Sequence, residues 1–264
     1  MNDRIDFYRR VVTTWIPDPS VSVLVVGGEG NDQDVFREKG FAAVTLLNLG
    51  SGPESLPAGW RYVRAAGDRL PFPDASFDVV IAHATLHHCR SPHAVLLEMY
   101  RVARSRVVFV EARDSGLMRL VERLGVTQVY ETSAVHFNEG VRGGVDDTAI
   151  PNFIYRWTER EVEKTIRTCA PHHEPAFQYL YGLALPQTPR ASKNRTISRL
   201  LVDAASPLVR LAVRLFPRQQ NLFAACICKP PDGRLKPWLR QADDGTITFD
   251  RAWGERHFQS GVPN

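Results

Sequence analysis

Residues 21–36 read VSVLVVGGEGNDQDVF, and residues 67–89 read GDRLPFPDASFDVVIAHATLHHC. Each stretch contains a run of Val and Ile that ends in small, acidic or imidazole side chains. The first run ends in Gly27, Gly28 and Gly30 and continues into polar residues, a pattern typical of a strand, a tight turn and a helix N-terminus. Because backbone N–H groups are free at such an N-terminus, we expect a ligand to bind at these strand ends.

Strands and helices alternate over the first 112 residues. Apolar runs predict strands at 21–28, 43–50, 59–66, 77–84 and 106–112, and the patterns at 32–40 and 92–105 predict helices. Strands without strict alternation of polar and apolar residues indicate a parallel sheet covered on both faces. Right-handed crossovers then bring the carboxyl ends of the strands to one edge. We therefore predict a Rossmann-like α/β fold with a cofactor crevice at that edge.

The second half of the chain is less regular. A helix is predicted at 114–125, followed by a polar, glycine-rich loop at 136–155 of the kind that covers binding sites. Thr158 and Glu161 form a capping-box pattern, which predicts a helix N-terminus. Two further strands are predicted at 176–185 and 221–230, separated by a helical insertion.

Composition is that of an ordinary globular protein. The 264 residues are 44% hydrophobic and 23% charged, and the net charge is +4. Basic residues form no long block and are not interleaved with aromatic residues, so no nucleic-acid partner is predicted. The first residues lack an apolar signal region, and no apolar run reaches the ~20 residues needed to span a bilayer. We expect a cytoplasmic protein without an integral membrane segment.

Cysteine usage agrees with a reducing compartment. Cys89 and Cys169 are isolated, and Cys226 and Cys228 form a C-x-C pair inside a strand-like run. Residues two apart on a strand point to the same face without the turn that a metal knuckle needs. The expected state is four reduced thiols, and the sequence predicts no metal.

The segment GDRLPFPDASFDVVIAHATLHHC resembles the class I S-adenosylmethionine-dependent methyltransferases, where the pattern D-A-x-x-L-P-F-x-D-x-S-F-D-x-V precedes L-H-H. The matching residues fall in register without a gap: Leu70, Pro71, Phe72, Asp74, Ser76, Phe77, Asp78, Val80, Leu86, His87 and His88. The resemblance continues through Glu98, Arg101 and Val102 and covers residues 21–111. It implies a seven-stranded, mostly parallel sheet with a reversed last strand and helices on both faces.

The resemblance also implies a cofactor site for S-adenosylmethionine, with S-adenosylhomocysteine as product. It places Gly27, Gly28 and Gly30 along the methionine part, Asn48 at the ribose and His83 facing the methyl donor. Asp68, two residues after the position that the family uses for the adenine, is expected either to accept from the adenine amine or to cap the next turn. Several positions depart from the family pattern: Val25 replaces an acidic residue, Glu29 and Asn31 replace glycines, Asn48 replaces the ribose-binding acid, and Ala66 replaces an aspartate.

Catalysis by positioning is expected, because a sulfonium is already a good leaving group. His83 and His136 are the predicted general bases, since imidazole titrates near neutral pH. His83 is also expected to belong to the cofactor site, and for His136 the alternative is an exposed loop position. At least one of His87 and His88 is expected to have a packing or helix-start role.

The predicted domain organisation is a methyltransferase domain at 1–229, with lid or substrate elements at about 114–156 and 186–220, and a C-terminal tail at 230–264 that packs on it. The predicted activity is biosynthetic transfer to a small-molecule or glycan acceptor, at oxygen rather than nitrogen. The alternatives are a catalytically silent protein that binds a cofactor or metabolite, and a nucleotide-binding oxidoreductase, which the glycine spacing disfavours. The basic, leucine-rich stretch 199–215 is expected to cover the sheet or the substrate, with peripheral membrane contact as the alternative.

Overall fold

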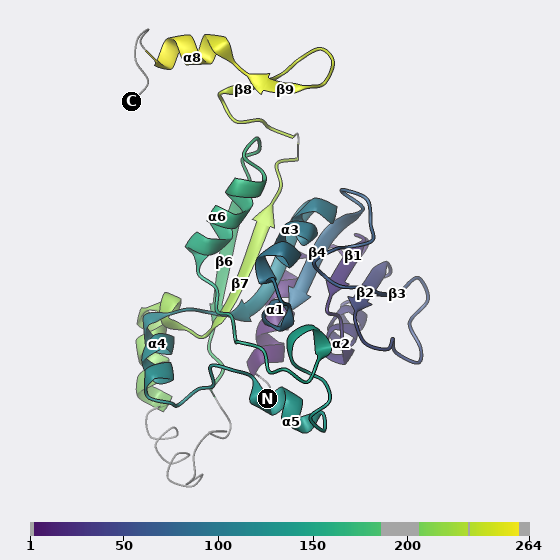
Figure 1. The fold of residues 1–264 in the computed structure, drawn as a ribbon, viewed down its shortest axis with the longest axis vertical. Helices are drawn as coiled ribbons and strands as arrows, with labels where there is room; N and C mark the ends of the chain where they lie inside the picture. Colours follow the sequence, from purple (N-terminus) through teal and green to yellow (C-terminus); the bar gives the residue numbers. More distant parts are fainter. Residues whose placement is uncertain (1–2, 186–205, 232, 259–264) are drawn as a thin grey trace.

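The computed structural model describes residues 3–185, 206–231 and 233–258. Seven strands form one sheet in the order β3-β2-β1-β4-β5-β7-β6 (Figure 1). Their bounds are β1 Val23–Val26, β2 Val44–Asn48, β3 Arg61–Arg64, β4 Phe77–His83, β5 Ala103–Ala112, β6 Ala176–Gly182 and β7 Leu222–Cys228.

Strand directions confirm the predicted fold class. The pairs β1–β2, β1–β4, β2–β3 and β4–β5 are parallel, whereas β7 runs antiparallel to both β5 and β6. The last strand of the sheet in chain order is therefore the reversed one. Strand β1 lies between β2 and β4, so β2 and β3 are added on one side of β1, and β4 and β5 on the other. A sheet whose strand order reverses in this way has a crevice at the carboxyl ends of its strands, at the switch point.

Helices cover both faces of the sheet and create two apolar cores. On one face, α1 (Asp3–Trp15) and α2 (Gly30–Glu38) bury Tyr8, Val11 and Phe36. On the other face, α3 (Pro92–Val102) and α6 (Glu159–Cys169) bury Met99 and Ile166. The central strands are buried on both faces, which is why their sequences are almost continuously Val, Leu and Ile.

Shorter helices connect the strands on the side of the crevice. They are the 3₁₀ turns η1 (Leu86–His88), η2 (Val145–Asp147) and η3 (Pro217–Gln219), and the helices α4 (Gly116–Arg123) and α5 (Thr132–Phe137). The predicted capping box of α6 is present, with the Thr158 backbone N–H donating to Glu161 and the Glu161 N–H donating to the Thr158 hydroxyl.

Two features differ from the sequence prediction. The predicted helix 92–105 ends at Val102, and β5 begins at the next residue, because Ala103 already pairs with Phe77 of β4. The predicted loop 136–155 contains the end of α5 and the turn η2.

Of the second predicted substrate element, residues 186–205 lie outside the described residues, as do the predicted helix-face residues Arg199, Leu200 and Leu201. Residues 206–215 are helical. They expose Leu208, Leu211 and Leu215 and bury Val213.

After β7 the chain contacts the domain and then leaves it. The Lys236 backbone N–H donates to the His172 carbonyl, and the Lys236 ammonium lies 2.9 Å from the Glu174 carboxylate. The hairpin of β8 (Leu239–Gln241) and β9 (Ile247–Phe249) and the helix α8 (Arg251–His257) then extend away from the sheet (Figure 1). Trp238 and Trp253 pack on each other within this tail, with ring centroids 5.8 Å apart.

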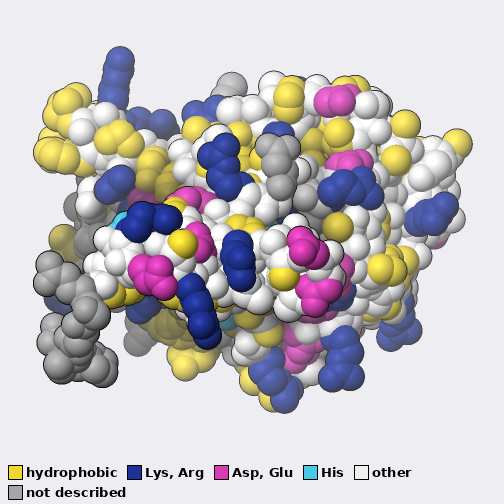
Figure 2. All heavy atoms as spheres, turned by 90° about the horizontal axis from the view of Figure 1, so that it is seen from above, with side chains coloured by type: hydrophobic (Ala, Val, Ile, Leu, Met, Phe, Trp, Pro, Cys, Tyr) yellow, Lys and Arg dark blue, Asp and Glu magenta, His cyan; other side chains and the backbone are white. Residues whose placement is uncertain are grey.

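The surface carries both signs of charge. On the face drawn in Figure 2, Lys and Arg side chains are interspersed with Asp and Glu. Within the described residues, no helix combines the length and the apolar character needed to cross a membrane.

Candidate active site

A cleft of about 530 Å³ lies at the carboxyl ends of β1, β2 and β3. Its walls come from the turns after these three strands, from η1, and from the loop that carries η2. The lining residues include Gly28, Glu29, Gly30, Asn48, Gly52, Tyr62, Ala66, Gly67, Asp68, His88, Cys89, Arg142, Gly144, Asp146 and Asp147. Four of the residues predicted from the sequence to contact a cofactor, namely Gly28, Gly30, Asn48 and Asp68, are thus brought to one cleft.

The three predicted glycines have different roles in the turn after β1. Gly27 has a φ of +71°, and a Cβ there would lie 2.2 Å from Cγ2 of Thr85, so this position needs glycine for the framework itself. A Cβ on Gly28 would lie 2.9 Å from the Leu46 side chain. Gly30 has nothing within 4 Å of its added Cβ and faces open space.

Glu29 and Asn48 meet at the rim of the cleft. Partial enclosure and the nearby charge of Asp32 raise the pKa of Glu29, although a hydrogen bond from Asn48 opposes this rise. The Asn48 amide oxygen accepts a hydrogen bond from the Leu49 backbone N–H at 2.7 Å, and its NH₂ group lies 3.4 Å from the Gly28 carbonyl. Glu29 also takes part in the capping box of α2 with Asp32. A carboxylate thus lies beside Asn48 at this rim of the cleft.

The two predicted bases lie in different surroundings. His83 stacks on the Tyr8 ring with centroids 4.0 Å apart, and its Nδ1 lies 3.7 Å from an oxygen of the buried Asp32. Burial, reinforced by Asp32, raises the pKa of Tyr8. His136 is exposed on α5 and packs edge-on against Phe137.

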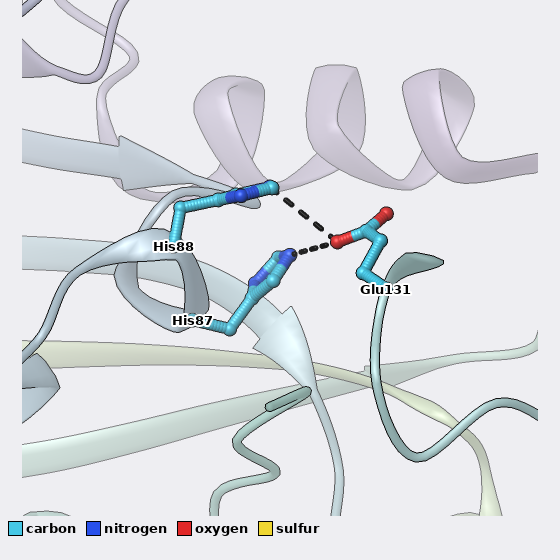
Figure 3. A group of neighbouring side chains, drawn as sticks. All are labelled: His87, His88 and Glu131. Atoms are coloured by element: carbon cyan, nitrogen blue, oxygen red, sulfur yellow. Dashed lines mark ion pairs between the residues drawn. The ribbon is translucent and has the colours of Figure 1, made fainter. Parts of the chain in front are cut away.

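A cluster of histidines and carboxylates borders the cleft (Figure 3). Of its residues, only His87 and His88 were considered in the sequence analysis. His87 Nε2 lies 3.3 Å, and His88 Nε2 lies 3.5 Å, from the same oxygen of Glu131. The other ring nitrogen of His87 lies 2.5 Å from Glu111, which is fully buried. Glu111 also accepts the backbone N–H groups of Thr85 and Leu86, at 2.9 and 2.7 Å.

Charges in this cluster are strongly coupled. Burial alone would lower the pKa of His87, but the adjacent Glu111 and Glu131 carboxylates outweigh it and raise the pKa to about 10. Hydrogen bonding to His87 lowers the pKa of Glu131 to about 2. Burial, together with the charge of His87, lowers the pKa of His88. The cluster therefore holds one charged imidazole between two carboxylates, beside a second imidazole that favours its neutral form.

Sequence reasoning missed both carboxylates of this cluster. Glu111 had a detectable signal, because an acidic residue in the strand-like run RVVFVEA must find a partner when the strand is buried. Glu131 had none. It precedes α5 in an irregular segment, and its backbone N–H donates to the carbonyl of Asn152, which is distant in the sequence.

Comparison with known sequences gives a match over the same region. Residues 28–110 match the family model described as "Methyltransferase domain". A ubiquinone/menaquinone biosynthesis C-methyltransferase from Xanthomonas oryzae is 34% identical over 109 residues, covering 36% of this chain and 43% of that protein. An uncharacterized methyltransferase from Mycobacterium sp. strain KMS is 31% identical over 122 residues, covering 45% of each chain. The chain thus spans less than half the length of these curated relatives.

Solved structures share the fold at low identity. A 1,6-didemethyltoxoflavin-N1-methyltransferase from Burkholderia thailandensis has a TM-score of 0.50 at 16% identity, covering 86% of this chain and 79% of that one. A SAM-dependent methyltransferase from Archaeoglobus fulgidus also has a TM-score of 0.50, at 11% identity, covering 86% and 94%. The family match over residues 28–110 and the sheet order together confirm the resemblance to class I methyltransferases that was first seen in the sequence.

Proposed function

We propose that this chain is an S-adenosylmethionine-dependent methyltransferase. The observation that carries the proposal is the cleft at the ends of β1, β2 and β3, which the matched residues 28–110 line together with the loop that carries η2. Four of the predicted cofactor residues line it, namely Gly28, Gly30, Asn48 and Asp68. Its volume of about 530 Å³ is within the ~300–1,000 Å³ usual for ligand pockets.

The residues present fit such a cofactor. Gly30 leaves open space beside the turn after β1, where the methionine part would lie against the backbone. The Asn48 amide and the Glu29 carboxylate would share the ribose hydroxyls, with Glu29 supplying the charge-assisted acceptor that Asn48 lacks. Asp68, on the wall formed after β3, would accept from the adenine amine.

The cofactor, when bound, supplies an activated methyl group on a positively charged sulfur. The protein then has to bind both reactants, align them and keep water out, which accounts for most of the acceleration in such a transfer. The acceptor atom bonds to the methyl carbon as the carbon–sulfur bond breaks, and the acceptor's proton is released. His83 and His136 stay the predicted bases for that proton.

The proposed acceptor is a small molecule or glycan, methylated at oxygen. A hydroxyl acceptor suits the polar side chains of His88, Asp146 and Asp147, which line the cleft. These groups can hydrogen-bond to a hydroxylated ligand. We also propose a cytoplasmic location, with support from the four cysteines, which are all free thiols.

The second candidate function is binding without transfer, and the departures at Val25, Glu29, Asn31 and Asn48 favour it. Calorimetry with S-adenosylmethionine and S-adenosylhomocysteine, followed by a turnover assay with a panel of hydroxylated acceptors, separates the two. Micromolar binding with turnover supports the methyltransferase. Binding without turnover on any acceptor supports the silent protein, and absence of binding overturns both.

Glu29→Gln tests the ribose assignment within this proposal. Replacing a charged acceptor by a neutral one should weaken S-adenosylmethionine binding by about 1–2 kcal/mol, or roughly 5- to 30-fold. Glu38→Gln, at the far end of the same helix and paired with Arg9 on the surface, is the matched control and should leave affinity unchanged. Equal affinities for the Glu29 variant and the control would refute the role of Glu29.

Contact with a membrane surface is retained as an alternative role for the helical residues 206–215, because Leu208, Leu211 and Leu215 are 71%, 55% and 67% exposed. Flotation with anionic vesicles tests it. Absence of the protein from the floated fraction would exclude this contact.

A further inference from the structure

The cluster of His87, His88 and Glu131 has a geometry that ion pairing alone does not require. Both imidazoles direct their Nε2 atoms at one oxygen of a single carboxylate, as Figure 3 shows. The three donor atoms lie within 4.8 Å of one another, and no other group of three such donors meets this criterion in the described part of the chain.

We propose that His87, His88 and Glu131 bind one divalent transition-metal ion of the Zn²⁺ or Fe²⁺ class at the rim of the cleft. The ion replaces the Nε2 proton of His87, which is released to solvent, while the Nδ1 proton stays between His87 and Glu111. Bonds of 2.0–2.2 Å place neighbouring ligand atoms roughly 2.9–3.5 Å apart in octahedral or tetrahedral coordination. The two observed nitrogen–oxygen distances of 3.3 and 3.5 Å fall at the upper end of that range. Two imidazoles and one carboxylate favour these ions over Mg²⁺ or Ca²⁺, which prefer oxygen ligands.

A second set of hydrogen bonds orients the ligands. Histidines that bind metals usually donate the opposite ring N–H to a carboxylate, which fixes the ring and directs the other nitrogen to the ion. Glu111 has this position on His87, at 2.5 Å from Nδ1, and is itself held by two backbone N–H groups. Asn152 lies within hydrogen-bond distance of the Glu131 oxygen that faces the histidines, at 3.4 Å.

The position of the cluster gives the ion access to a ligand. His88 is one of the residues that line the cleft, while the His87 side chain is only 10% exposed. An ion with three protein ligands keeps open coordination positions. This last step rests on the proposed function: those positions would take oxygen atoms of the acceptor and orient it toward the cofactor.

The test uses the full chain without a histidine tag, stripped with EDTA and dialysed. Zn²⁺ is titrated by calorimetry, and Co²⁺ by its visible absorption bands, which report nitrogen and oxygen ligands. The expected result is one ion per chain. Glu131→Gln and His88→Asn should each weaken Co²⁺ binding at least ~10-fold and change its spectrum.

His172→Asn is the matched control, because His172 and His173 form another adjacent pair, with ring centroids 4.1 Å apart. Its Co²⁺ affinity should equal that of the wild type. Failure to bind one ion, or equal binding by the wild type and by both cluster variants, would overturn the proposal. Calorimetry with S-adenosylmethionine on the stripped protein is independent of this outcome, so loss of the metal site and loss of the proposed function are distinguishable.

Discussion

Replacing Glu111 by Gln should destabilise the protein far more than the loss of an average carboxylate. Glu111 is fully buried at the end of β5 and accepts from the backbone of Thr85 and Leu86 as well as from His87. The rise in the pKa of His87 from 6.5 to about 10 corresponds to roughly 5 kcal/mol in favour of the charged imidazole, as the net of its attraction to the carboxylates and its desolvation. Glu131 supplies part of this, so we expect Glu111→Gln to cost about 3 kcal/mol, at the lower end of values for breaking a buried ion pair.

The pH dependence of this loss is predictable in sign. A raised histidine pKa stabilises the folded state fully below the unfolded value of 6.5, and this stabilisation disappears as the pH rises toward about 10. The difference between wild type and Glu111→Gln should therefore be largest near pH 6 and should shrink steadily between pH 6.5 and 10. Urea unfolding in EDTA, followed by tryptophan fluorescence, measures it without interference from bound metal.

Glu174→Gln is the control for this experiment. Glu174 pairs with Lys236 at 2.9 Å, but its side chain is 59% exposed, so its removal should cost at most ~1 kcal/mol. A Glu111→Gln cost as small as that of Glu174→Gln would refute the reasoning, as would a cost that grows between pH 6.5 and 10.

Three further predictions concern the glycine turn, the predicted bases and a helix cap. Gly27→Ala should cost at least ~2 kcal/mol in urea unfolding, because it adds a left-handed alanine and a contact of 2.2 Å with Thr85; Gly30→Ala, which meets nothing within 4 Å, should be nearly neutral in stability. If His83 or His136 is the general base, its Ala variant should lower the rate of methyl transfer by ~10²-fold or more, and the assignment fails if both variants stay within a few-fold of wild type. Thr158→Ala should cost ~1 kcal/mol in the same unfolding assay through loss of the α6 cap, whereas no change would mean that the capping box contributes nothing.

The fold was predictable because burial on both faces leaves a strong sequence pattern. Val23–Val26 and Val79–Ala82 are buried, so these positions require apolar side chains whatever the sequence is elsewhere in the chain. The strand ends were located for the same reason, and Asn48 and Asp68, which were predicted from their positions after strands, both line the cleft. The end of α3 was placed too late, because pairing of Ala103 with β4 overrides the helical tendency of the residues that follow.

The carboxylates of the candidate metal site could not be predicted in the same way. Glu131 reaches the histidines through an irregular segment, positioned by hydrogen bonds such as that from its backbone N–H to Asn152. Such contacts leave no periodicity in the sequence. Glu111 is distant from His87 in sequence, and their meeting depends on the pairing of β4 with β5, which a single sequence does not specify.

The departures from the family pattern can be sorted by what each glycine contacts. Gly27 is retained, and its left-handed backbone packs against Thr85, whose N–H is held by Glu111. The framework of the turn and the cluster beside it therefore depend on the same contacts. Glu29 and Asn31 stand where the family has glycines, and Glu29 lines the cleft. Because Gly27, which holds the framework of the turn, is unchanged, we expect Glu29 and Asn31 to leave the fold intact and to change the affinity for the ligand. The binding assay with Glu29→Gln measures that effect for Glu29.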